Sequence, residues 1–184
     1  NDCNTVLANE QVIDGQCWRS DSVVVKKDLE QWFFKITDYA DRLLADLSEL
    51  DGWPERVKTM QENWIGRSVG AEFSFRLAEG EGEIPVYTTR QDTVFGVSYI
   101  VLAPEHPLVE KLIAGKDTET AVRSFVERVR NLSEINRTST ETEKEGLFTG
   151  AYALHPFTGE LVPIWVANYV LYEYGTGAVM GVPA

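Results

Sequence analysis

The chain has 184 residues, 43% of them hydrophobic and 25% charged, which is typical of a globular protein with a buried core. Its 17 basic and 29 acidic residues give a net charge of −12, which argues against a free-standing nucleic-acid-binding protein. The sequence has no membrane-length apolar run and no signal segment, and its two cysteines imply no disulfide framework, so a cytoplasmic location is expected. A start at Asn1 and an apolar strand running to Ala184 suggest a piece of a longer protein.

The first third of the chain is expected to be rich in turns and then helical. Asp14 and Gly15 lie between apolar residues, as is typical of the tip of a β-hairpin. Apolar residues recur at helical spacing from Leu29 to Leu50, which predicts one amphipathic helix. Pro54 suits the first turn of a shorter helix that runs toward Gln61.

After Ser68 the pattern changes to short strands with helices between them. Alternation over 72–77, followed by an acidic glycine loop over 79–83, predicts a β-hairpin. Further strands are expected at 84–88, 93–103, 147–154, 161–166, 168–173 and 177–182, and helices at 107–114 and 118–136. Helices inserted between groups of strands predict an α+β fold with a barrel-like β core.

Cysteine and histidine are too few and too scattered to predict a metal site. The segment from Cys17 to Ser20 would form half of a zinc knuckle only if position 20 were cysteine, and Cys3 cannot complete a set of four ligands. His106 and His155 each precede a proline and show no ligand spacing. They are interpreted as ordinary turn histidines, and no metal is expected.

Two segments could together form a pocket for a small polar ligand. Residues 87–93 cluster threonines at a bend between two predicted strands, and residues 174–183 form an uncharged strand punctuated by glycines. Glycine lacks the Cβ that would block close approach of a ligand or another backbone. Plainer interpretations stay open, because threonine is a good strand residue and the glycine spacing matches neither the dinucleotide fingerprint nor the P-loop.

Five motifs carry a family resemblance when they are taken together. They are Asn63-Trp64-Ile65-Gly66-Arg67-Ser68, Thr88-Thr89-Arg90-Gln91-Asp92-Thr93, Ala103-Pro104-Glu105-His106-Pro107-Leu108, Gly150-Ala151-Tyr152-Ala153, and Tyr174 through Pro183. In this order and at this spacing they resemble bacterial-type leucyl-tRNA synthetases over essentially the whole chain. Arg90, Asp92 and Met180 favour the leucyl enzyme over its isoleucyl and valyl relatives, which carry other residues in these motifs.

The resemblance implies two domains. Residues 68–184 would belong to the editing (connective polypeptide) domain, truncated at its C-terminal side, and residues 1–67 to the catalytic domain, with a degenerate zinc-knuckle region, the amphipathic helix and a hinge. The full-length enzyme would join leucine to tRNA with ATP at a synthetic site whose H-I-G-H and K-M-S-K-S signatures are absent here.

The implied reaction of this chain is post-transfer editing. It would hydrolyse the ester of tRNA(Leu) mischarged with norvaline, isoleucine or methionine, and the cleavage step would need no cofactor. The implied partners are the aminoacylated 3′ end of tRNA(Leu) and the rest of the synthetase, with no membrane involved.

The resemblance also implies roles for individual residues. Thr88 and Thr89 match hydroxyls that bond the substrate near the scissile ester and help to hold water, and Arg90 would orient the substrate. Thr93 matches the threonine that narrows the pocket against leucine. The other expected substrate-binding residues are Asp92, Tyr174, Gly177, Met180 and Val182.

Two departures from the family pattern affect these expectations. Gln91 stands where proline is usual, so a less rigid loop is expected. The family's H-D-x-R-D motif, whose last aspartate pairs with the α-ammonium of the substrate, would follow Ala184, so the chain alone is expected to deacylate poorly. A non-catalytic amino-acid or nucleotide-binding β module stays open as an alternative, as does a structural insertion whose threonines only pack.

Overall fold

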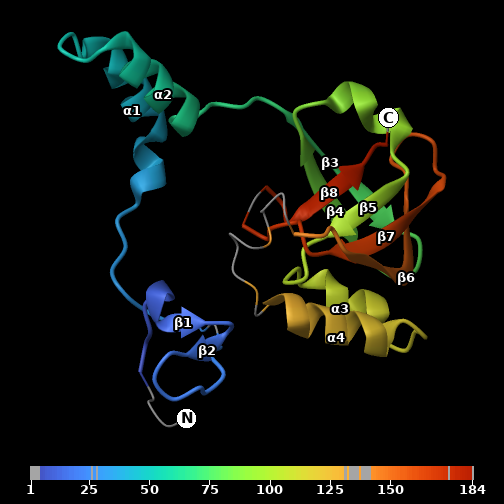
Figure 1. The fold of residues 1–184 in the computed structure, drawn as a ribbon. Helices are drawn as coiled ribbons and strands as arrows, with labels where there is room; N and C mark the ends of the chain where they lie inside the picture. The colour runs from blue at the N-terminus through green and yellow to red at the C-terminus, as the bar shows by residue number, and fades with distance from the viewer. Residues whose placement is uncertain are drawn as a thin grey trace. The chain divides into compact units, whose positions relative to one another are not determined.

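A computed structural model describes residues 5–25, 27, 29–130, 132, 137, 142–173 and 175–183. The contacts within the chain divide it into two compact units, one made of Asn1–Lys26 with Gly70–Ala184 and the other of Lys27–Val69. Figure 1 shows the helices and strands of each unit. The assignment of residues 1–67 to a catalytic domain and of 68–184 to an editing domain stays a prediction.

A small hairpin lies near the N-terminus. After the 3-10 helix η1 (Asn9–Gln11), strand β1 (Val12–Ile13) pairs antiparallel with β2 (Gln16–Cys17). Asp14 and Gly15 between them have φ angles of 50° and 77°, which are the left-handed conformations that a tight hairpin turn of this type requires. The predicted hairpin tip is therefore confirmed.

The unit Lys27–Val69 is a short helical hairpin. Its elements are η2 (Ile36–Tyr39), α1 (Ala40–Asp46), η3 (Leu47–Glu49) and α2 (Glu55–Ile65). Gly66, with a φ of 53°, ends α2 in a left-handed conformation. Within these four elements no described side chain is fully buried. The hairpin therefore has little core of its own.

The predicted helix over 29–50 is wrong in its first half. Residues 29–35 are not helical where they are described, and regular α-helix covers only Ala40–Asp46. Trp32 and Phe33 of the predicted apolar stripe are 101% and 76% exposed, so this first part of the stripe has no partner within the unit. Short helices in water gain most of their stability from packing of the apolar face, and consecutive aromatic residues have modest helix propensity.

The second part of the larger unit is a six-stranded sheet in the order β4-β3-β6-β7-β5-β8. All its neighbouring strands run antiparallel except β5 and β7, which are parallel. The strands are β3 (Ala71–Leu77), β4 (Glu83–Thr88), β5 (Tyr99–Leu102), β6 (Gly146–Leu154), β7 (Leu161–Ala167) and β8 (Ala178–Gly181). The two edge strands, β4 and β8, contact each other, but no β-ladder joins them among the described residues. The α+β class is therefore confirmed, with a curled sheet that is not a closed barrel.

Two helices cover this sheet, α3 (Leu108–Ile113) and α4 (Glu119–Arg130). They contact each other and β6, and Figure 1 shows them side by side against the sheet. Their apolar faces and the inner face of the sheet form one core, whose largest fully buried members include Phe75, Ile84, Ile100, Leu102, Ile113 and Ile164. Part of the predicted helix beyond Arg130 lies outside the described residues.

One predicted strand begins later than expected. Residues 93–96 belong to a 3-10 helix, η4 (Gln91–Gly96), and β5 starts only at Tyr99. Threonine side chains bond to the backbone at this bend, and such local bonds compete with strand pairing. The expected bend is therefore present, but it extends through Gly96 as η4 and delays the start of β5.

A second predicted strand, over 168–173, is absent, since β7 ends at Ala167 and turns follow it. The amide side chain of Asn168 accepts a hydrogen bond from the backbone N–H of Glu145 and donates one to the carbonyl of Glu143. These side-chain bonds occupy backbone groups that a continued strand would have paired.

Candidate functional site

The threonine-rich bend after β4 is closed by its own hydroxyl groups. Thr88 Oγ1 accepts a hydrogen bond from the backbone N–H of Arg90 at 3.0 Å. Thr93 Oγ1 donates to the carbonyl of Arg90 at 2.8 Å, and the Thr93 N–H donates to the same oxygen at 3.1 Å. The backbone on both sides of Gln91 is therefore held without the proline that the family pattern carries there.

Thr93 is half-buried, in contrast to the exposed Thr89. Because the Thr93 hydroxyl donates to Arg90 within the bend, the γ-methyl and the oxygen Oγ1 are the parts of the side chain left to meet other groups. Toward a ligand, Thr93 can therefore present its γ-methyl and accept a hydrogen bond at Oγ1, but its proton is already donated to Arg90.

Arg90 and Asp92 form an exposed, two-pronged ion pair within the bend. Arg90 Nε donates to Asp92 Oδ1 at 3.0 Å, and Nη2 donates to Oδ2 at 2.9 Å. The hydrogen bond from Arg90 holds the pKa of the Asp92 carboxyl below its ordinary value, and the same bond raises the pKa of the guanidinium. Both expected site residues are thus engaged with each other in this structure.

The glycine-punctuated segment lies on the edge strand β8. Gly177 is buried with a φ of 69°, and its carbonyl accepts a hydrogen bond from the Ala103 N–H at 2.9 Å. A Cβ at position 177 would lie 2.7 Å from Cδ2 of Tyr172, so only glycine fits without a shift. Tyr174 lies outside the described residues.

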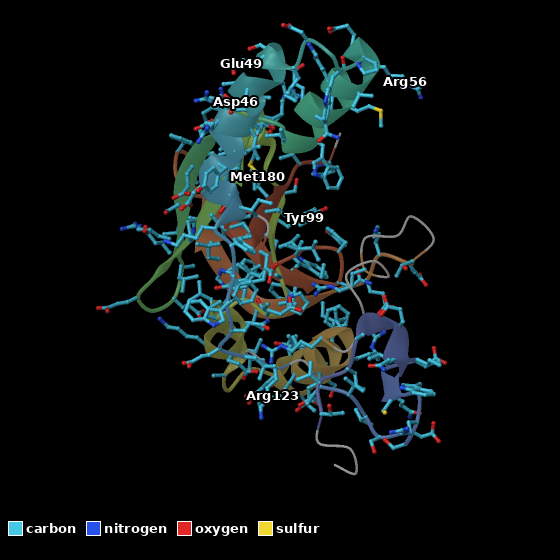
Figure 2. All side chains as sticks on the ribbon, turned by 90° about the vertical axis from the view of Figure 1, so that its left-hand side faces the viewer. Asp46, Glu49, Arg56, Tyr99, Arg123 and Met180 are labelled. Atoms are coloured by element: carbon cyan, nitrogen blue, oxygen red, sulfur yellow. The ribbon has the colours of Figure 1, made fainter. Side chains whose placement is uncertain are left out.

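The wall residues expected on this segment are half-buried. Met180 pairs with Ile100 across the β5–β8 ladder, and Val182 follows the strand. Figure 2 labels Met180 on β8 and Tyr99 on β5, the strand that pairs with it. Met180 also packs against the main core.

The structure brings the bend and the glycine segment together along the edge of the sheet where β4 and β8 contact each other. A Cβ at Gly96, the last residue of η4, would lie 3.0 Å from Cγ1 of Val182. A Cβ at Gly175 would lie 3.9 Å from Cβ of Tyr87, the residue before Thr88. The two segments are about 80 residues apart in the chain but adjacent in space, as a shared pocket requires.

An open groove in the same unit is lined by Gly175 and Thr176 of this segment. Its other lining residues are Glu72, Glu83, Pro85, His106, Pro107, Leu108, Tyr172 and Glu173, and none of residues 88–93 lines it. Burial lowers the pKa of the His106 imidazole, which favours its neutral form. The groove therefore borders the glycine segment but does not include the threonine bend.

Two buried polar side chains, one beyond each end of β7, make long-range contacts that the sequence analysis did not predict. Arg137, only 3% exposed, donates to the carbonyls of Asn168 and Val170 and pairs with Glu105 at 2.7 Å. His155 contacts the carbonyl of Val94 in η4 at 2.9 Å. Each joins segments far apart in the chain, so no local sequence signal marks its partner.

The described part of the chain shows neither a metal-binding cluster nor a helix able to span a membrane. Its residues contain no group of three or more histidine, cysteine, aspartate or glutamate side chains placed to hold a metal ion. Among its helices, none is both long and apolar enough to cross a membrane.

Comparison with known families decides which kind of protein this is. The family model for the leucyl-tRNA synthetase editing domain matches residues 62–184. The chain belongs to this family. The recognition made from the five motifs is therefore confirmed for the editing domain.

Full-length relatives agree with this leucyl-tRNA synthetase assignment. The chain is 65% identical over 189 aligned positions to the leucine–tRNA ligase of Nitratidesulfovibrio vulgaris Miyazaki F, covering 99% of this chain and 22% of that protein. It is 63% identical to the leucine–tRNA ligase of strain DP4 over 183 positions, with 99% and 22% of the two chains covered. The chain thus spans about a fifth of the length of these relatives.

A solved structure gives the same result for the editing-domain fold. The chain matches a crystal structure of the ternary complex of Agrobacterium radiobacter K84 agnB2 LeuRS with tRNA and LeuAMS, with a TM-score of 0.71 and 46% sequence identity. The match covers 96% of this chain and 22% of that one. The roles of individual site residues stay predictions.

Proposed function

We propose that this chain carries the post-transfer editing site of a leucine–tRNA ligase and hydrolyses the ester of mischarged tRNA(Leu). The match of residues 62–184 to the synthetase editing domain is the observation that carries the proposal. The full-length protein would be the aminoacyl-tRNA ligase, using ATP at a synthetic site that lies outside this chain.

The physical need for such a site comes from the limits of apolar recognition. A synthetic pocket gains only about 1–3 kcal/mol from one methylene group, so it cannot strongly reject near-isosteres of leucine. Norvaline, isoleucine and methionine are therefore the expected errors. A second site must admit these side chains and exclude leucine.

Thr93 is proposed to be the residue that excludes leucine from the editing site. Its hydroxyl is bonded to the Arg90 carbonyl, which restrains the side chain, and the γ-methyl is proposed to meet the substrate. A fixed methyl at the pocket would leave too little room for the branched end of leucine. Met180, Val182, Gly177 and Tyr174 are proposed to complete the substrate-binding wall.

The proposed chemistry is attack of water on the ester carbonyl. The water oxygen bonds to the carbonyl carbon, the ester C–O bond breaks, and the terminal ribose hydroxyl leaves with a proton as the free amino acid is released. Thr88 and Thr89 would bond the substrate and position the water. A hydroxyl that accepts one hydrogen bond, as Thr88 does from Arg90, keeps its own proton for donation. Positioning and hydrogen bonds to developing charge supply most of such catalysis.

The proposed macromolecular partner is the aminoacylated 3′ end of tRNA(Leu), bound together with the rest of the synthetase. The support is that the similar Agrobacterium LeuRS was solved in a complex with tRNA. In this chain Arg90 is paired with Asp92, and the net charge is −12, so most phosphate contacts would come from other parts of the protein. A cytoplasmic location stays a prediction.

The proposal can be tested in a chimera in which this chain replaces its counterpart in the Nitratidesulfovibrio vulgaris Miyazaki F ligase. Three variants separate size from hydrogen bonding at position 93: Thr93→Ala, Thr93→Ser and Thr93→Val. We expect Ala and Ser, which remove the methyl, to raise hydrolysis of leucyl-tRNA(Leu) about 10- to 200-fold, the range that one such group provides. Valine keeps the volume and should preserve rejection of leucine.

Deacylation of leucyl-tRNA(Leu) and norvalyl-tRNA(Leu) is the measurement. If Thr93→Ala leaves leucyl-tRNA intact while norvalyl-tRNA is cleared normally, the role of Thr93 is wrong. If the unsubstituted chimera clears neither substrate but binds them, the binding-module alternative is favoured. The same assay on the 184-residue chain tests whether it deacylates poorly by itself.

A further inference from the structure

His155 is a buried histidine that the proposed chemistry does not use. It lies directly after β6, at the turn that leads into β7, and its side chain is only 4% exposed. Its backbone is fixed on both sides, because its N–H donates to the Glu160 carbonyl at 2.8 Å and its carbonyl accepts from the Gly159 N–H at 2.9 Å. The ring is therefore carried by a closed hairpin turn.

The hydrogen bonds of the ring define which nitrogen carries the proton. Nδ1 accepts from the backbone N–H groups of Phe157 at 3.2 Å and Thr158 at 3.1 Å, so it has no proton of its own. In the neutral ring the proton then lies on Nε2, which donates to the carbonyl of Val94 at 2.9 Å. Both ring nitrogens are therefore hydrogen-bonded: Nδ1 to the hairpin turn and Nε2 to η4.

Aromatic side chains also pack against the His155 ring. Phe75 meets it edge-on at 5.9 Å, and Phe95, the residue after Val94, stacks on it at 6.1 Å with an interplanar angle of 28°. Phe95 also contacts Phe157 of the turn at 5.7 Å. The end of η4 is thus attached to the turn by a hydrogen bond and by two ring contacts.

Val94 is the immediate neighbour of Thr93 and is itself only 5% exposed. The bend carrying Thr93 is closed by bonds within itself, but those local bonds do not determine where the bend lies relative to the sheet. The His155–Val94 bond links residues 61 apart and supplies that connection. A pocket that excludes a substrate by size loses selectivity when the residues lining it move by a fraction of the size of a methyl group.

We propose that His155 is a positioning residue for size exclusion, holding η4 through the Val94 carbonyl so that the Thr93 methyl keeps leucine out. This inference rests on the proposed editing function. His155 does not contact the substrate in this scheme; it acts through Val94 and Thr93.

Two substitutions of His155 distinguish anchoring of η4 from stabilisation of the hairpin turn alone. His155→Asn places an oxygen near the position of Nδ1, so it can keep the bonds from Phe157 and Thr158, but it is too short to reach Val94. His155→Gln is long enough for its amide nitrogen to donate to the Val94 carbonyl. Thr158→Ala is the matched control, because it removes the bonds of the Thr158 hydroxyl to Glu160 in the same turn without touching the ring.

In the chimera we expect His155→Asn to raise leucyl-tRNA(Leu) hydrolysis at least about 10-fold relative to the unsubstituted protein, the lower end of what one methylene discriminates. His155→Gln should recover part of the lost selectivity, and Thr158→Ala should keep all of it. The inference is overturned if His155→Asn rejects leucine as well as the unsubstituted chimera, or if Thr158→Ala loses as much selectivity.

A second measurement does not depend on editing. Amide hydrogen exchange of Thr93 and Val97, whose N–H groups close η4, should accelerate in the 184-residue chain carrying His155→Asn but not in that carrying Thr158→Ala. Unchanged exchange in His155→Asn overturns the anchoring role. If the unsubstituted chimera clears no mischarged tRNA, the proposed function fails, and the exchange result still decides whether His155 anchors η4.

Discussion

The sheet unit and the helical hairpin over Lys27–Val69 place similar aromatic residues in opposite environments. Phe75, on β3, is 0% exposed within a core shared by the sheet, α3 and α4, whereas Phe34, before α1, is 98% exposed. Both segments follow a clear apolar periodicity in the sequence, but only the sheet unit supplies partners for its apolar face. The comparison teaches that periodicity predicts an element reliably only where the chain itself provides the surface that buries it.

The strongest test of this contrast is a matched pair of phenylalanine substitutions. Phe75→Ala should lower the free energy of unfolding by about 3–5 kcal/mol, because it removes a fully buried ring and leaves a cavity. Phe34→Ala should change it by less than about 0.5 kcal/mol, as expected for an exposed site. Urea unfolding of the 184-residue chain, followed by circular dichroism, measures both. A comparable loss for the two variants would break the contrast by showing that Phe34 is buried in solution.

A smaller loss of folding stability is expected on substitution of Gly177, which combines close packing with a positive φ angle. Gly177→Ala should cost about 1–3 kcal/mol, because the new Cβ adds both left-handed strain and overlap with the Tyr172 ring. Gly159 has a similar φ of 74° and open space around its missing Cβ, so Gly159→Ala carries only the left-handed backbone cost of about 1 kcal/mol. Thermal unfolding of both variants isolates the contribution of the Tyr172 contact. Equal losses would mean that Tyr172 moves aside freely.

The smallest effect concerns the exposed pair of Arg90 and Asp92. The folded-state pKa of Asp92 lies below its unfolded value, mainly because Arg90 donates to the carboxylate, so the pair contributes stability above the unfolded pKa. That contribution is lost as the pH falls through the folded-state pKa. A carboxyl titration by NMR should show the pKa of Asp92 rising in Arg90→Gln and, more modestly, in high salt, since exposed pairs are screened. An unchanged Asp92 pKa in Arg90→Gln would show that the pair does not persist in solution.

Features that depend on neighbouring residues could be predicted from the sequence. Alternation in β3 and β4, the Asp14-Gly15 hairpin tip and the core of α4 follow from local periodicity and turn chemistry. The family could also be recognised, because several motifs in order are more specific than any single one. A shared pocket of the threonine bend and the glycine segment was hypothesised from their residue types and then from the resemblance, and the contacts of Gly96 and Gly175 agree with their proximity.

Features that depend on distant partners could not be predicted. A bend at residues 87–93 was expected, but residues 93–96 were predicted as strand and belong to η4 instead. Nothing local shows that Thr88 and Thr93 bond the backbone of Arg90. His155 was interpreted as an ordinary turn histidine, since its Nδ1 does accept bonds from its own turn, and its second bond reaches across the fold to Val94. Sequence periodicity contains no information about such a bond.

The hydrogen bond from the Thr93 hydroxyl to the Arg90 carbonyl has a consequence for engineering. If the cut-off in side-chain size depends on a γ-methyl and the cleavage rate on the neighbouring alcohols of Thr88 and Thr89, the two properties reside on different atoms. Residues of graded volume at position 93 would then retune which amino acids are discarded while leaving the turnover of accepted substrates largely intact.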